Sequence, residues 1–237
     1  MSETDFSEQR KKLVASMRLQ DKKVKKAFLS VPREKFFPEE LKQHAYADTA
    51  FPIGSGQTIS QPSTIAAMLE MLAAEERQKI LEVGTGSGYA AALLSEIVGK
   101  NGKVFGIELL HELHQQATRT LLELGYKNIE LKSGDGTQGW KEEAPFDRIL
   151  ISAACSQVPE PLVEQLAEKG KLVVSEFELP AGLQPKQVVG LAIEAGADVA
   201  IIGCRGAAVA AVVMRRPGIE LDCGEVVRAV ASRLGLR

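Results

Sequence analysis

Apolar and polar positions in the central part of the chain follow two periods, which alternate along the sequence. Short apolar runs with the length of a strand occupy five stretches, at residues 79–83, 103–108, 129–133, 146–152 and 171–175. Longer stretches that are patterned for one helical face lie between them, at residues 89–98, 109–124 and 159–168. Strands that alternate with helices in this way predict an α/β fold with a doubly wound, mainly parallel sheet.

The N-terminal part is patterned differently. Apolar residues spaced for one helical face predict a helix over residues 6–30. It ends before Pro32, because a residue that precedes proline disfavours the helical conformation. Residues 33–62 are punctuated by proline and glycine and are predicted to be irregular, and a helix is predicted at 63–72. A loop of this length is uncommon unless it binds something.

The C-terminal segment differs from the rest in composition. Between residues 187 and 237 the chain has no lysine, histidine, threonine or aromatic residue, and alanine, valine, glycine and arginine dominate. The pattern predicts helices at residues 185–195 and 224–234 and a strand at 198–203. It points to no particular function.

Length and charge limit the class of protein. A chain of 237 residues is long enough for one large α/β domain, with or without an appendage. The formal net charge of −2 gives no general attraction to nucleic acid or to an anionic membrane, so neither is expected as a partner. Basic residues at 10–12 and 22–26 are interpreted as solvated helix faces.

Cysteines and apolar runs indicate the compartment. Cys155, Cys204 and Cys223 are widely separated, which argues against a disulfide framework and a zinc site, so no metal is expected. The first residues lack the apolar core of a signal peptide, and the longest apolar run, 207–214, is far shorter than a membrane span. We therefore expect a cytoplasmic protein.

A glycine turn follows the first strand, in the sequence Leu81-Glu82-Val83-Gly84-Thr85-Gly86-Ser87-Gly88-Tyr89. Glycines at this place let the backbone pass close to a ligand and leave helix N–H groups facing it. A dinucleotide site has the spacing GxGxxG and binds a pyrophosphate. Here the spacing is GxGxG, and Glu82 would repel a pyrophosphate but suits a ligand with sulfonium and ammonium groups. The turn alone is also compatible with a purely structural role.

Acidic residues follow the next two strands as well. Glu108 ends the second strand, where an acid in doubly wound folds accepts hydrogen bonds from ribose hydroxyls. Asp135 follows the third strand and could accept a hydrogen bond from an adenine amino group. Each acid alone is typical of a solvated loop, but three acids at successive strand ends lie at the edge where such sheets bind ligands. Together they favour S-adenosylmethionine as the cofactor.

A more specific string lies in the irregular loop before the helix at 63–72. Its sequence is Pro52-Ile53-Gly54-Ser55-Gly56-Gln57-Thr58-Ile59-Ser60-Gln61-Pro62, and it resembles the signature of the protein-L-isoaspartate O-methyltransferase family. The glycine turn, the Gly134-Asp135-Gly136 triplet and the runs 144–149 and 159–162 occur in the same order as in that family. The resemblance covers about residues 10–175, and the loop string is its specific part, since many methyltransferases share the glycine turn.

The resemblance implies the Rossmann-like fold of class I S-adenosylmethionine-dependent methyltransferases. It implies an enzyme that transfers a methyl group from S-adenosylmethionine to the carboxylate of L-isoaspartyl residues in damaged proteins. We expect the protein to be a monomer. Ser60 would be the catalytic residue. The residues implied to hold the cofactor are Thr58, Ile59, Glu82, Gly84, Thr85, Gly86, Ser87, Gly88, Glu108, Asp135 and Gly136.

The resemblance also divides the chain into three parts. Residues 1–62 would form an N-terminal helix and the active-site loop, residues 63–176 the cofactor-binding core, and residues 177–237 a divergent segment of unknown role. The family usually closes its sheet with a hairpin after a Pro-Val-Gly turn. Ser175-Glu176-Phe177-Glu178 replaces that turn here, and the Phe-Val-Pro-Leu strand near which the family usually ends does not follow.

The implied reaction makes few demands on ionisable side chains. A carboxylate with an ordinary pKa near ~4 is already ionised at neutral pH, so no general base is needed. Ser60 would donate a hydrogen bond that orients this carboxylate, and the alternative is that Ser60 caps the helix at 63–72, where Ser63 competes. His44, which is near the loop, is interpreted as structural.

Two other functions remain open at this point. One is a methyltransferase of the same fold that acts on a small molecule or on RNA, although the loop string argues against it. The other is a module that binds the cofactor without turnover, because its C-terminal part has changed.

Overall fold

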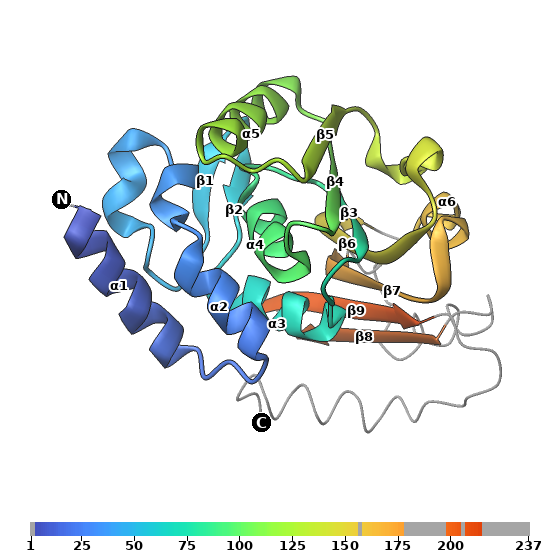
Figure 1. The fold of residues 1–237 in the computed structure, drawn as a ribbon, viewed down its shortest axis with the longest axis horizontal. Helices are drawn as coiled ribbons and strands as arrows, with labels where there is room; N and C mark the ends of the chain where they lie inside the picture. Colours follow the sequence, from blue (N-terminus) through green and yellow to red (C-terminus); the bar gives the residue numbers. More distant parts are fainter. Residues whose placement is uncertain (1–2, 156–157, 178–197, 205–206, 215–237) are drawn as a thin grey trace.

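A seven-stranded sheet, with the strand order β5-β4-β3-β6-β7-β9-β8, organises the fold of this computed structural model (Figure 1). The structure describes residues 3–155, 158–177, 198–204 and 207–214. Five neighbouring strands are parallel, namely β3 (Lys79–Val83), β4 (Lys103–Glu108), β5 (Ile129–Ser133), β6 (Phe146–Cys155) and β7 (Leu166–Phe177). Two antiparallel strands follow, β8 (Asp198–Cys204) and β9 (Ala207–Met214). The predicted doubly wound, mainly parallel sheet is therefore confirmed.

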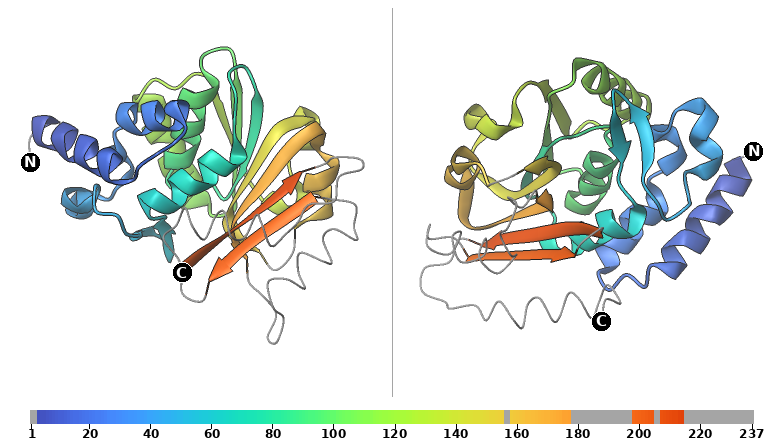
Figure 2. Two further views of the ribbon diagram at one scale, coloured as in Figure 1. Left: turned by 90° about the horizontal axis from the view of Figure 1, so that it is seen from below. Right: turned by 180° about the vertical axis from the view of Figure 1, so that it is seen from behind.

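Helices cover both faces of this sheet. One face carries α3 (Pro62–Leu72), α4 (Tyr89–Val98) and α5 (His111–Glu123), with α1 (Glu3–Ser16) and α2 (Lys22–Ser30) outside them. Figure 2 shows α1 to α4 gathered on one side of the twisted sheet. The other face carries the short helix α6 (Glu160–Glu164). Because both faces are covered, the central strands read as continuous apolar runs.

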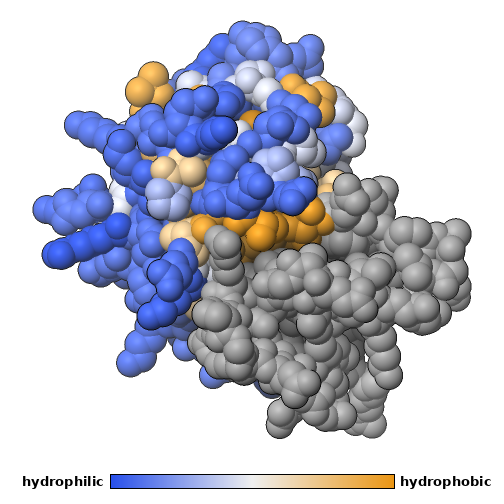
Figure 3. All heavy atoms as spheres, turned by 90° about the vertical axis from the view of Figure 1, so that its right-hand side faces the viewer, coloured by the Kyte–Doolittle hydropathy of each residue, from blue (hydrophilic) through white to orange (hydrophobic). Residues whose placement is uncertain are grey.

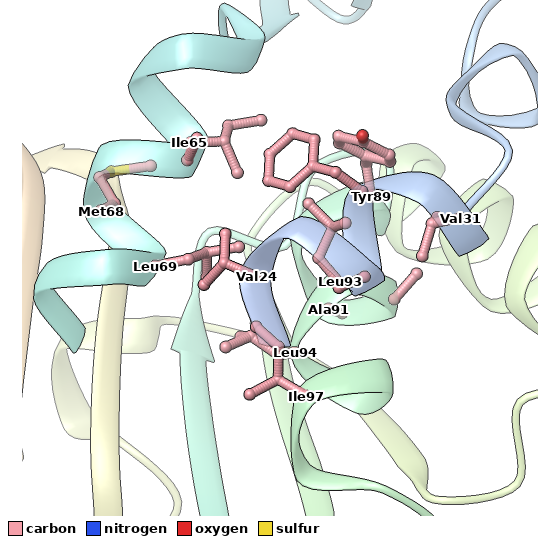
Figure 4. Close-up of a cluster of buried hydrophobic side chains, with 14 of the residues drawn as sticks. Val24, Val31, Ile65, Met68, Leu69, Tyr89, Ala91, Leu93, Leu94 and Ile97 are labelled. Carbon is pink, nitrogen blue, oxygen red and sulfur yellow. The ribbon is translucent and has the colours of Figure 1, made fainter. Parts of the chain in front are cut away.

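Successive strand residues divide between two apolar cores. Ile80 and Val104 join the core beneath α3, α4 and α5, whereas Leu81 and Phe105 join the core beneath α6. This division follows from the alternation of side chains along a strand. In the first core, Val24 of α2 packs among apolar side chains of α3 and α4 (Figure 4).

The helix predicted over residues 6–30 is two helices, so this prediction was wrong at residues 17–21. The Asp21 side chain accepts hydrogen bonds from the Lys23 and Val24 amides and so starts α2. Arg18 has a φ of 51°, which no continuous helix permits. The apolar pattern continues across the break because α1 and α2 pack against the same core.

Residues 33–62, predicted to be irregular, contain two 3₁₀ helices, Arg33–Phe36 and Glu39–His44, and a β-hairpin. The hairpin consists of β1 (Phe51–Gly54) and β2 (Gln57–Ile59). Its turn has positive φ angles of 98°, 50° and 70° at Gly54, Ser55 and Gly56. Strands this short, one with a proline, show too little alternation to be predicted.

The helix predicted over residues 159–168 is shorter than expected. It ends at Glu164, and β7 begins at Leu166, which pairs with Phe146. The Gln165 side chain accepts from the Trp140 amide and donates to the Gln138 carbonyl. These contacts distant in sequence end the helix.

The strand predicted at 198–203 is confirmed, and it belongs to a pair of strands that extends the sheet beyond β7. β8 falls on the predicted strand 198–203, and the apolar run 207–214 forms β9. β9 pairs antiparallel with β7 through residues 171–174, and β8 pairs with β9. The helices predicted at 185–195 and 224–234 lie outside the described residues.

The described surface is mostly hydrophilic on the side drawn in Figure 3, with an apolar strip near its middle and smaller apolar spots above it. Large exposed apolar side chains in the described part of the chain are Leu29, Leu109 and Leu122. They lie on different elements, and single exposed apolar residues are ordinary. No described helix combines the length and the apolar character that a bilayer crossing needs.

Candidate active site

A small, solvent-open cavity lies at the carboxyl ends of β3 and β6. Its walls come from β2 and the residue after it, from α3, from the glycine turn and from the start of α4. The lining residues are Thr58, Ile59, Ser60, Ile65, Met68, Glu82, Gly84, Thr85, Gly86, Ser87, Tyr89, Ala90 and Ser152. The loop with the specific string and the glycine turn therefore face the same space.

The glycine turn uses most of its amides within the protein. The Gly84 and Thr85 amides donate to the Ile107 carbonyl at 2.8 and 3.3 Å, and the Gly88 amide donates to the Thr85 carbonyl at 2.9 Å. Few amides of the turn itself are therefore free to bind a ligand. A turn with few free donors is a poor site for a pyrophosphate, in agreement with the acid before it.

At Gly84 and Gly136 the backbone of the site packs directly against other residues, Ala153 and Val83. Gly84 has a φ of 83°, and a Cβ there would lie 2.8 Å from the Ala153 Cβ. A Cβ at Gly136 would lie 2.4 Å from Val83 Cγ1. Both positions require glycine, because the packed neighbours leave no room for a side chain.

Glu82 is the buried acid of the cavity. Its side chain is 0% exposed, Ser152 Oγ donates to Oε1 at 3.0 Å, and Oε2 has no partner among the described residues. Burial raises the pKa of Glu82 to about 8; the Ser152 hydrogen bond opposes the rise and the Glu108 charge adds to it. A buried carboxyl with a free oxygen is an acceptor held ready for a donor or a cation.

Glu108 is hydrogen-bonded to the glycine turn and is not among the residues that line the cavity. Its Oε2 accepts from the Gly86 amide at 2.7 Å, and its Oε1 accepts from the Leu110 amide at 2.9 Å. Each carboxylate oxygen can accept a second hydrogen bond, so capacity for a hydroxyl remains. Glu108 is therefore able both to shape the turn and to bind a ligand.

Asp135 and its neighbour lie at the same sheet edge but outside the cavity lining. The Asp135 carboxylate is exposed and accepts from the Thr137 amide at 2.9 Å, which starts a 3₁₀ turn, Gly136–Gln138. That backbone hydrogen bond lowers the pKa of Asp135 below its ordinary value. Asp135 is therefore ionised at neutral pH and accessible.

Ser60 lies half-buried in the cavity wall, just before α3. It does not cap α3, because Gln61 occupies the N-cap position and makes no capping bond with its side chain. The cap comes from Asp48, whose Oδ1 accepts from the Ser63 amide at 2.8 Å. The capping interpretation of Ser60 is wrong, and no described residue is hydrogen-bonded to its hydroxyl.

The predicted site residues divide into two groups. Those in the cavity wall are Thr58, Ile59, Ser60, Glu82, Gly84, Thr85, Gly86 and Ser87. Those at the same edge but outside the wall are Gly88, Glu108, Asp135 and Gly136. His44 is outside as well and stacks on Phe51, with the ring centroids 5.6 Å apart.

Five lining residues were not predicted. Ile65 and Met68 come from α3, Tyr89 and Ala90 from α4, and Ser152 from the end of β6. The pairing of Val83 with Ile151 brings Ser152 next to Glu82. Ser152 is the last residue of the strand predicted at 146–152, so the sequence placed it at a strand end. It did not show that this strand pairs with the strand that carries Glu82.

The site fits S-adenosylmethionine better than a phosphorylated cofactor. Glu82 offers a buried, unpartnered oxygen, the turn offers few free donors for an anion, and acids follow three successive strands. Among the residues that the structure describes, no three His, Cys, Asp or Glu side chains are grouped to hold a metal ion. Together with the strand order, this site defines a class I S-adenosylmethionine-dependent methyltransferase.

Comparison with known proteins places the chain within that class. The family model described as protein-L-isoaspartate(D-aspartate) O-methyltransferase matches residues 7–214, so the chain belongs to this family. The match extends past the resemblance at residues 10–175 and takes in β8 and β9.

Relatives and solved structures agree with this assignment. Protein-L-isoaspartate O-methyltransferase 2 of Archaeoglobus fulgidus is 47% identical over 173 residues, which cover 72% of this chain and 79% of the relative. The enzyme named protein-L-isoaspartate O-methyltransferase in Ignicoccus hospitalis is 46% identical over 168 residues, covering 71% and 80%.

Among solved structures, one protein-L-isoaspartate O-methyltransferase has a TM-score of 0.66 at 32% identity. The match covers 70% of this chain and 55% of the other, so this chain spans about half the length of that protein. A Plasmodium falciparum protein that carries the family's name was solved in complex with S-adenosyl-L-homocysteine. It has a TM-score of 0.62 at 28% identity and covers 73% of this chain and 84% of its own.

Proposed function

We propose that this protein transfers a methyl group from S-adenosylmethionine to the carboxylate of L-isoaspartyl residues in damaged proteins. One observation carries the proposal. Ser60, from the loop with the family string, lines the same cavity as Glu82 and the glycine turn. An acceptor that contacts this loop is thus next to the space that a cofactor on the turn would fill.

S-adenosylmethionine would supply the methyl group, with an O–C bond formed to the acceptor carboxylate and a C–S bond broken. Glu82 would accept from the cationic part of the cofactor, and Glu108 and Asp135 from its ribose and adenine groups. The remaining residues proposed to hold it are Thr58, Ile59, Gly84, Thr85, Gly86, Ser87, Gly88 and Gly136.

Ser60 would orient the acceptor carboxylate. Its hydroxyl has no partner among the described residues, so it is free to donate. A donor in this position fixes the direction of attack without taking part in proton transfer, since the acceptor is already ionised at neutral pH.

The apolar part of the cavity would exclude water from the reaction. Ile59, Ile65 and Met68 line it and are 4% exposed or less. A cation and an anion become neutral products, so a dry and ordered site favours the transition state.

The proposal extends to the organisation of the enzyme. Residues 1–62 would contribute the helical cover and the active-site loop, residues 63–176 the cofactor-binding core, and residues 177–237 a segment whose role is open. We propose a monomer that acts in the cytoplasm on proteins with isoaspartyl residues, and not on nucleic acid or at membranes.

The test compares an isoaspartyl peptide with its normal aspartyl twin, using labelled S-adenosylmethionine and the purified full chain. We expect methyl transfer to the isoaspartyl peptide alone, because the loop accepts a backbone that is longer by one methylene. Equal rates on both peptides would indicate a different carboxyl methyltransferase. Cofactor binding, seen as a raised melting temperature, without transfer to either peptide would indicate a binding module or another acceptor.

A further inference from the structure

Arg33 is a fully buried arginine that lies outside the cavity lining. Its side chain is 0% exposed. Nε donates to the Ala45 carbonyl and Nη2 to the Ser60 carbonyl, both at 2.9 Å. A single guanidinium thus joins two points of the active-site loop that are distant in sequence.

The same guanidinium lies against two aromatic rings. Its Cζ is 4.7 Å from the Tyr89 ring centroid and 5.2 Å from the Phe37 ring centroid. Tyr89 is the first residue of α4, directly after the glycine turn, and lines the cavity. Arg33 therefore connects the backbone of Ser60 with the helix that follows the cofactor turn.

A buried arginine without an acidic partner is not expected if the position serves stability alone. In the part of the chain that the structure describes, Arg33 forms no salt bridge, and Nη1 is buried without a partner. Removing a charge from water is costly, and an apolar side chain of similar volume often does as well or better. What an apolar side chain lacks is a rigid fork of donors that holds two carbonyls in one geometry.

Glu34 and Tyr46, the residues that follow Arg33 and Ala45, form a second contact between the same two segments. Glu34 accepts from the Tyr46 hydroxyl, and Arg10 Nε donates to that hydroxyl at 2.8 Å. Arg33 and Glu34 thus contact Ala45 and Tyr46, two consecutive residues of the loop. These contacts join the 33–36 segment to the 45–46 segment at two consecutive positions.

We propose that Arg33 is a positioning residue. By bridging the Ala45 and Ser60 carbonyls, it holds the Ser60 backbone in place in the cavity wall. Because Arg33 is not among the residues that line the cavity, we assign it no direct contact with acceptor or cofactor. Its effect on methyl transfer passes through the placement of Ser60 and so rests on the proposed function of that residue.

The experiment compares R33K and R33M with a matched control, R148K. Arg148 also binds main-chain carbonyls, with Nε 2.8 Å from the Leu72 oxygen and Nη2 3.2 Å from the Ala73 oxygen, but at the far end of α3. A lysine at either position keeps the charge and loses the fork. Each full-length variant is assayed for methyl transfer to the isoaspartyl peptide, for S-adenosylhomocysteine affinity and for backbone hydrogen exchange.

We expect R33K to lower kcat about ten- to a hundredfold, because small displacements of positioning groups have effects of this size. S-adenosylhomocysteine affinity should stay within about twofold, and amides at residues 57–61 should exchange faster. R33M should lose more, and R148K should keep the parent kcat and the parent exchange at 57–61.

Unchanged exchange at 57–61 in R33K would overturn the proposal, even if the parent enzyme proved inactive on the peptide. So would a folded R33K with the parent kcat, or a failure of both Arg33 variants to fold, which would make Arg33 a stabilising residue only. An inactive parent with faster exchange in R33K would refute the proposed function and leave the positioning role supported.

Discussion

At the scale of single residues, Glu82 has the most unusual ionisation of the site. Burial is the main cause of its raised pKa of about 8, against an ordinary value of 4.5. Without a ligand this carboxyl is therefore mostly protonated at neutral pH. A cationic ligand in contact with it would favour the ionised form.

This shift predicts a pH dependence of stability. The folded-state pKa of Glu82 lies above its unfolded value, so its contribution is fully present below about pH 4.5 and is lost as the pH rises through 8. We expect the free energy of unfolding of the ligand-free parent to fall relative to that of Glu82→Gln over this window. Urea unfolding of both proteins at several pH values measures it, and parallel curves would contradict it.

Ser60 predicts a separation of turnover from stability. Because its hydroxyl caps no helix and has no described partner, Ser60→Ala should unfold with nearly the parent free energy. A hydrogen bond to a charged acceptor contributes roughly 1.5–3 kcal/mol, so kcat should fall about ten- to a hundredfold.

Cofactor affinity, measured by calorimetry, should stay within a few-fold in this variant. A fully active Ser60→Ala enzyme would remove Ser60 from the mechanism. Ser60→Thr, which keeps a hydroxyl, serves as the control for loss of the donor.

At the scale of elements, α3 depends on a cap from outside its own sequence. Pro62 occupies the first turn, Gln61 provides no capping bond, and Asp48 from the loop accepts from the Ser63 amide. The Gln61 side-chain amide donates to Ser63 Oγ at 2.9 Å and to Asp48 Oδ2 at 3.3 Å. These hydrogen bonds join the loop around Asp48 to the start of α3, close to Ser60.

Loss of this cap should be measurable. We expect Asp48→Ala to lower the free energy of unfolding by about 1 kcal/mol, the usual value of an N-cap. Asp48→Asn keeps an acceptor oxygen and should lose less. Equal stability of Asp48→Ala and the parent in urea would show that the Ser63 amide is satisfied by water instead.

At the scale of the whole molecule, β9 completes the sheet. It covers β7 through residues 171–174, and β8 in turn pairs with β9. Without these two strands, β7 would be an exposed edge next to the central β6, and unpaired edges promote aggregation.

Truncation tests this role. The family match and β9 both end at residue 214, so a chain of residues 1–214 is expected to bind the cofactor and transfer methyl groups at close to the full-length rate. A chain of residues 1–177 lacks both strands and is expected to aggregate or unfold. Circular dichroism and the peptide assay check both chains, and an inactive 1–214 chain would assign a function to residues 215–237.

The parts that the sequence by itself determined are those that neighbouring residues encode. The strands at 79–83, 103–108 and 129–133, the glycine turn and the helix at 89–98 follow from local periodicity, and the structure has them with the same bounds. The family followed from the specific string in the loop and from the order of the shorter motifs after it. Each of these features depends on residues a few positions apart, which a single sequence displays directly.

The tertiary structure decided what depends on partners distant in the chain. It separated α1 from α2, capped α3 through Asp48, brought Ser152 to Glu82 and added β9 to the edge of β7. The burial that raises the pKa of Glu82 and the two carbonyls that Arg33 bridges also come from segments far apart in sequence. Burial and hydrogen bonding of this kind depend on which surfaces meet, and periodicity along one segment does not specify its neighbour.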